Sequence, residues 1–84
     1  MPTISMFYGI IITMNWNDHN PPHIHAKYQD KNAIFTFDGE LNEGKFPKKQ
    51  TRLVQAWIAL HEEELVANWN LAMSGEILFR IDPL

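Results

Sequence analysis

The stretch Asp18-His19-Asn20-Pro21-Pro22-His23-Ile24-His25-Ala26 decides how this chain folds, because it joins one apolar segment to the next. Pro21 and Pro22 fix their own φ angles and favour extended conformations in the residue before each, so the backbone is stiff here. If a strand follows, alternation places His23 and His25 on one face and their apolar neighbours on the other. The stretch therefore predicts two imidazoles that a rigid corner aims in the same direction.

Apolar segments on both sides of this corner predict an antiparallel sheet of about four to five short strands with short turns between them. The expected strands are Thr3–Phe7, Ile10–Trp16, His23–Gln29, Ala33–Phe37 and Glu76–Asp82. The polar residues 40–46 predict a loop that contains one short extended piece.

A helical region is expected from Pro47, a favourable first-turn residue, to Met73, where Ser74-Gly75 ends it. Its apolar residues form two stripes that point about 100° apart, and a straight helix cannot place both on one sheet. We therefore predict a bent helix, or two consecutive helices, with the break near His61 and Glu62. The predicted class is α+β, with the helical region packed on one face of the sheet.

The composition fits one small domain that spans residues 1–84. The chain has 45% hydrophobic residues, a net charge of −3 and no cysteine, which excludes disulfides and thiolate metal sites. The Ile10-Ile11-Ile12 run is too short to span a bilayer, and the N-terminus lacks a secretory signal, so we expect a cytoplasmic protein without membrane association. A chain this small buries only about 60–65% of its unfolded surface, so it must use its apolar residues efficiently or share a surface with a partner; self-association is left open.

His23 and His25 carry the strongest chemical signal, and three interpretations stay open. As catalytic residues, one imidazole would take a proton from a phosphodiester and the other would give one, with Lys27 stabilising phosphate charge. As metal ligands, His19, His23 and His25 would bind one ion, with Asp18 as the alternative third ligand. As structural residues, the histidines would brace the turn through hydrogen bonds to loop carbonyls. No cofactor is expected.

Two further groups have both a structural and a functional interpretation. His61 lies in an apolar stripe, which is typical of a partly buried core residue, although the helix break would bring it towards the strand histidines in the alternative. Four basic residues gather at the expected helix start, where cations oppose the helix dipole. This cluster is either a solvated face or a contact for an acidic partner or a phosphate of RNA or DNA. Its members are Lys45, Lys48, Lys49 and Arg52.

In this order the motifs resemble a family of small bacterial proteins described as domain of unknown function 4160. The residues that carry the resemblance are Phe7-Tyr8-Gly9-Ile10, the stretch from Asp18 to Ala26, Gly44-Lys45-Phe46-Pro47, Leu53, Trp57, His61, Glu64-Leu65 and Asn68-Trp69. Members of that family look like components of toxin–antitoxin-type gene pairs. The resemblance therefore implies a cognate protein encoded by a neighbouring gene, and it implies no catalytic residue.

Taken together, these observations lead us to expect a partner-binding component of a toxin–antitoxin-type system. It would bind its cognate protein through its helical face or through an open sheet edge. The alternative is a small metal-independent endoribonuclease-like enzyme that uses His23 and His25, and a further alternative is a histidine-based metal-binding protein.

Overall fold

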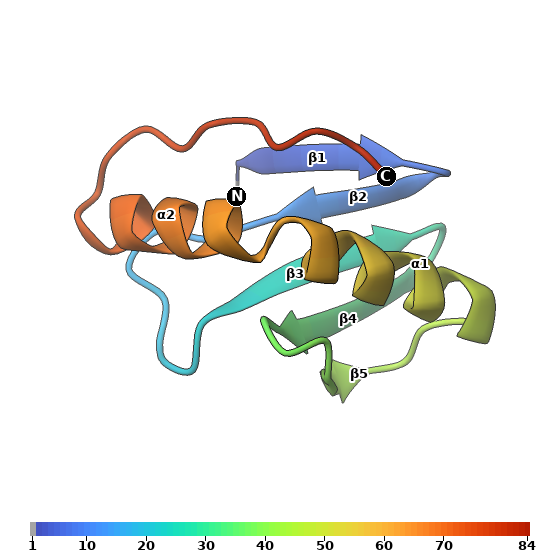
Figure 1. The fold of residues 1–84 in the computed structure, drawn as a ribbon. Coiled ribbons are helices and arrows are strands. Elements are labelled where there is room, and N and C mark those ends of the chain that lie inside the picture. The colour runs from blue at the N-terminus through green and yellow to red at the C-terminus, as the bar shows by residue number, and fades with distance from the viewer. Residues whose placement is uncertain (1) are drawn as a thin grey trace.

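The computed structural model describes residues 2–84 and contains a five-stranded antiparallel sheet with two consecutive helices across one face (Figure 1). The strands follow one another in the order of the chain: β1 (Thr3–Phe7), β2 (Ile10–Thr13), β3 (His23–Tyr28), β4 (Lys31–Thr36) and β5 (Leu41–Gly44). The helices are α1 (Lys48–Leu60) and α2 (Glu62–Met73). The predicted α+β class, with helices on one side of an antiparallel sheet, is confirmed.

Tight turns between neighbouring strands produce this simple order. Tyr8 and Gly9, between β1 and β2, have φ angles of 49° and 77°, which match the twist of a two-residue hairpin turn. Gly44 ends β5 with a φ of 88°, and a Cβ atom there would overlap the carbonyl oxygen of Asn32. Only glycine therefore lets β5 lie this close to β4.

The core lies between the sheet and the helices. Alternate strand residues supply one side of it and apolar helix residues supply the other, and each fully buried aliphatic side chain contributes about 1.5–3 kcal/mol. Its main members are Ile4, Ile10, Ile12, Ile24, Ala26, Ala33, Phe35, Val54, Trp57, Ile58, Leu65 and Trp69. The ring of Phe7 lies 5.5 Å from that of Trp57, measured between centroids, so the first hairpin is packed directly against α1.

The predicted helix break is confirmed at His61, whose φ of −122° and ψ of 26° lie outside the helical range. Its N–H still donates to the carbonyl oxygen of Trp57 at 3.1 Å, and its own carbonyl accepts the N–H of Leu65 at 2.9 Å. The polypeptide therefore changes direction without losing these bonds, and both apolar stripes reach the sheet. Glu62, first of three glutamates in the first turn of α2, interacts favourably with the positive end of the helix dipole.

The predicted strand Glu76–Asp82 is wrong. Residues 76–84 have no regular secondary structure, although they run beside β1 (Figure 1). One backbone bond links them to that strand, from Ile81 N–H to the Ile4 carbonyl oxygen at 2.8 Å. The side chain of Asn68 bonds both the N–H and the carbonyl of Phe79, at 3.0 and 2.8 Å, so these groups cannot join a ladder.

The second strand is also shorter than predicted, since it ends at Thr13 and not at Trp16. Met14 is still buried, but its N–H bonds the Pro2 carbonyl at 3.2 Å, and the residues that follow turn away from the sheet. The short extended piece expected within residues 40–46 is β5. Among the described residues 2–84, no helix is both long enough and apolar enough to cross a membrane.

Candidate functional site

The corner between β2 and β3 is tied to the end of α2. The N–H of Asn17, whose φ is 51°, donates to the Ala72 carbonyl oxygen at 3.2 Å. The indole N–H of Trp16 donates to the Glu76 carbonyl oxygen at 2.8 Å. These two bonds anchor residues 14–22 at both the helix end and the C-terminal segment, so the loop has a defined shape.

Asp18 is the centre of the side-chain cluster that this loop builds. Its Oδ1 accepts the N–H of His19 at 2.8 Å. Its Oδ2 lies 2.9 Å from Nε2 of His23, 3.5 Å from Nε2 of His25 and 3.3 Å from Nδ2 of Asn15. One carboxylate oxygen thus contacts both strand histidines.

The hydrogen bonds at Asp18 stabilise its ionised form. Burial alone would raise the pKa of this carboxyl group, but the N–H of His19 and the rings of His23 and His25 lower it further than burial raises it. The net pKa is about 2, below the ordinary value of 3.8. Asp18 is therefore an acceptor at neutral pH, with its charge directed into the cluster.

His23 is the buried member of the cluster, with 3% of its side chain exposed. The loop covers one side of its ring, and Trp69 of α2 lies on the other, 5.3 Å away between centroids. Its Nδ1 donates to the Pro21 carbonyl oxygen at 2.7 Å, while Nε2 faces Asp18. The ring of His23 is therefore almost closed to solvent.

His25 is the accessible member, with 27% of its side chain exposed. Its ring centroid lies 5.4 Å from that of His23, so the two imidazoles do converge as the alternation predicts. The amide Nδ2 of Asn15 lies 3.3 Å from its Nε2, which places the lone pair of that nitrogen towards the cluster. Its position on β3 puts it on the face of the sheet that no helix covers.

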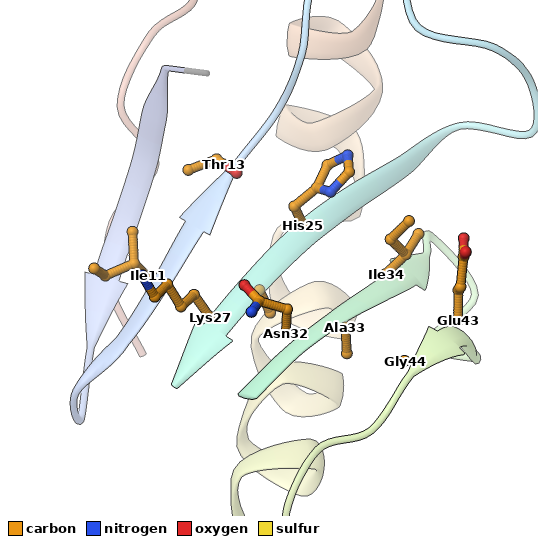
Figure 2. A pocket seen from close by; sticks show the side chains of 10 residues that line it. Ile11, Thr13, His25, Lys27, Asn32, Ala33, Ile34, Glu43 and Gly44 are labelled. Carbon is orange, nitrogen blue, oxygen red and sulfur yellow. The ribbon is translucent and has the colours of Figure 1, made fainter. Parts of the chain in front are cut away.

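That uncovered face, which we call the open face, contains two cross-strand rows of side chains. Met6, Ile11, Lys27 and Asn32 form the first row, and Thr13, His25, Ile34 and Glu43 form the second. A hollow of about 330 Å³ lies over these rows, and Figure 2 shows the side chains around it on the side of the sheet away from the helices. The open face thus combines exposed aliphatic groups with one imidazole and two opposite charges.

The other predicted site residues lie apart from the cluster or at its rim. His19 is 81% exposed, and its Nε2 is 3.8 Å from Oδ1 of Asp18. Lys27 is exposed on the open face, two residues along β3 from His25. His61 bonds Glu64, with 2.6 Å between Nδ1 and Oε1, and its ring lies 5.5 Å from that of Trp57 between centroids. The helix break therefore pairs His61 with Glu64.

The basic cluster lies at the start of α1, at the opposite end of the sheet from the proline corner (Figure 1). Its four side chains, Lys45, Lys48, Lys49 and Arg52, are all exposed. None of them makes an ion pair with another residue in the 2–84 range. They do not contribute charge to the histidine cluster.

Sequence reasoning treated Asp18 only as an alternative ligand and missed Asn15 and Trp69 as members of the site. Asp18 had a local signal, since a carboxylate five residues before a strand histidine can fold back across a proline turn. No local sequence signal marked Asn15 or Trp69. The contacts of Asn15 depend on β2 ending before it, and those of Trp69 depend on the direction of α2.

A model of the family described as "Domain of unknown function (DUF4160)" matches residues 9–70. The match covers four of the strands, both sides of the proline corner and most of α2. Comparison with curated proteins gives no match. Comparison with solved structures gives none either.

Proposed function

Since this chain belongs to the DUF4160 family, whose description names no activity, we propose its function from the open face: it binds a cognate protein encoded by a neighbouring gene. In this proposal the protein is the partner-binding component of a toxin–antitoxin-type pair in the bacterial cytoplasm. The observation that carries the proposal is the hollow over the open face, which is lined by two isoleucines together with an imidazole and two opposite charges.

The side chains of the open face have the arrangement of an interface. Met6 is 53% exposed, its register partner Ile11 is half-buried, and Ile34 in the second row is half-buried as well. Lys27 is the register partner of Ile11, and Glu43 is the register partner of Ile34, so each isoleucine has a charged neighbour. The two opposite charges favour a partner that carries a complementary pair. A mixture of apolar and charged side chains is compatible with a non-obligate interface, which is about as apolar as the rest of a protein surface.

Co-expression with the product of the neighbouring gene tests the proposal. We expect a complex that survives affinity purification and gel filtration. Ile34→Lys should weaken it by about tenfold or more, because a charged side chain would replace one of the aliphatic side chains that line the hollow. Val66→Lys is the matched control, since Val66 is a 46% exposed aliphatic residue of α2, and it should change affinity by less than about threefold.

Two results would count against the proposal. The first is failure of the two wild-type proteins to co-purify. The second is a complex that Val66→Lys weakens and Ile34→Lys leaves intact, because the partner would then bind the helical face.

A second candidate function is cleavage of RNA, favoured by the position of His25 between Asp18 and the hollow that Lys27 also lines. His25 would act as the proton-transfer group, Asp18 and the buried His23 would orient it, and Lys27 would stabilise the phosphate. His25→Ala should then lower RNA cleavage by about 100-fold or more. Equal growth inhibition and equal RNA cleavage by wild type, His25→Ala and Lys27→Ala would exclude this function.

A further inference from the structure

We propose that Asp18, His23 and His25 bind one divalent transition-metal ion of the class that takes nitrogen and oxygen ligands, with Zn²⁺ as the reference ion. The structure brings these three residues together, and the atoms in closest contact are Oδ2 of Asp18 and the Nε2 atoms of the two histidines, so we assign these as the ligand atoms. This site shares His25 with the hollow of the open face, but its test does not depend on the partner-binding proposal, because metal binding is measured on the protein alone.

The distances between the ligand atoms fit a shared ion. Ligands about 2.1 Å from one ion lie roughly 3.0 Å apart at a right angle and 3.4 Å apart at a tetrahedral angle. Oδ2 of Asp18 is 2.9 Å from Nε2 of His23 and 3.5 Å from Nε2 of His25. All three ligand atoms lie within 4.8 Å of one another, so only the edge between the two imidazoles has to shorten.

The hydrogen bonds around the cluster orient the ligand atoms for this purpose. Nδ1 of His23 donates to the Pro21 carbonyl oxygen, which is the outer partner that metal-binding histidines usually have. Its Nε2 bonds Oδ2 of Asp18 at 2.9 Å. A metal ion bound between these two atoms would take the place of the proton that they share, because metal binding releases ligand protons.

Nε2 of His25 lies 3.5 Å from the same oxygen of Asp18. The amide group of Asn15 is the only donor that the structure gives to Nε2 of His25, at 3.3 Å, and the same amide nitrogen lies 3.3 Å from Oδ2 of Asp18. Both bonds are long for N–H donors. Two imidazole nitrogens and a carboxylate oxygen therefore lie close together, and two of these three atoms have only a weak bond to the amide N–H of Asn15.

The burial of the three residues indicates what kind of metal site this is. His23 and Trp69 close the inner side, whereas His25 faces the open face. Two histidines and one carboxylate with an accessible side are typical of sites that keep a position for water or substrate. His19 is not among the ligands, because its ring is 81% exposed and reaches the other oxygen of Asp18.

Calorimetric titration of the metal-free protein with ZnCl₂ tests the site. We expect one Zn²⁺ per chain, with binding weakened at least about tenfold in Asp18→Asn and in His25→Ala, since even loss of an outer partner has that effect. His19→Ala and His61→Ala are the matched controls, because both remove a histidine from elsewhere in the chain. Each should bind Zn²⁺ within about threefold of wild type.

A second titration, with Co²⁺, guards against a variant that fails to fold. The visible absorption of bound Co²⁺ should appear in wild type and in His19→Ala, and it should be lost in His25→Ala, whose fold is checked by circular dichroism. The proposal is overturned if Zn²⁺ does not bind stoichiometrically, if Asp18→Asn and His25→Ala bind as wild type does, or if the controls weaken binding equally. Complex formation with the partner protein is a separate readout, so failure of either proposal can be recognised.

Discussion

The two faces of the sheet are made by neighbouring residues of the same strands, yet they differ in what covers them. Ile12 of β2 is fully buried under the helices, whereas Ile11 next to it is half-buried on the open face. On β3 the two faces meet at the proline corner, where Asp18 holds the enclosed His23 and the accessible His25 together. One face therefore provides most of the stability, and the other remains available for contacts.

The largest expected difference between the faces is in packing. Ile12→Ala should lower the free energy of unfolding by about 2–5 kcal/mol, because it leaves a cavity in the core. Ile11→Ala, the matched change on the open face, should cost less than about 1.5 kcal/mol. Urea unfolding followed by tryptophan fluorescence measures both values, and equal losses would mean that the open face is also covered.

The next effect concerns the approach of β5 to β4. Gly44→Ala combines a φ of 88° with overlap between the new Cβ and the Asn32 carbonyl, so it should cost more than about 2 kcal/mol. Gly75→Ala is the control, since Gly75 has a φ of 69° and no atom within 4 Å of an added Cβ. Its cost should be about 1 kcal/mol. A smaller loss for Gly44→Ala than for Gly75→Ala in thermal unfolding would contradict the close approach.

A moderate effect is expected at the corner between the faces. Asp18→Asn removes the charged acceptor from His23 and His25, and it should lower the free energy of unfolding by about 1–3 kcal/mol. Asp30→Asn, in the exposed turn between β3 and β4, should change it by less than about 0.5 kcal/mol. Equal values for the two variants in urea unfolding would show that the bonds from Asp18 to His23 and His25 do not stabilise the fold.

The smallest effect is a pH dependence with a defined sign. Because the folded pKa of Asp18 is about 2 and its ordinary value is 3.8, folding favours the ionised form. The resulting stability is complete above pH 4 and is lost as the pH falls towards 2. Urea unfolding at pH 4 and pH 2.5 should show a larger loss in wild type than in Asp18→Asn, and parallel losses would contradict the lowered pKa.

Local pattern was sufficient to predict most of the fold. Alternation located β1, β3 and β4, and the two apolar stripes located the helix break at His61, because each depends on which neighbours share a face. The same reasoning failed for residues 76–82, where Ile77 is 89% exposed despite its place in an alternating pattern. Asn68 binds the backbone of Phe79 there, and no spacing rule predicts such a contact between distant residues.

The candidate site was predicted only in part, because strand alternation specifies which residues share a face and does not specify contacts with a loop or a distant helix. The strand period indicated that His23 and His25 would converge, and the structure brings their rings together. The period could not indicate that Asp18 would join them, or that Trp69 would bury one ring and leave the other accessible, since these depend on the loop and on α2.

Histidine accessibility in the native protein tests most directly the claim that one carboxylate holds one enclosed and one accessible imidazole. Brief treatment with diethyl pyrocarbonate, followed by peptide mass spectrometry, reports the modification of each histidine separately. His19 and His25 should react readily, and His23 should react only after unfolding. Modification of His23 in the folded protein at the rate of His19 would contradict this claim.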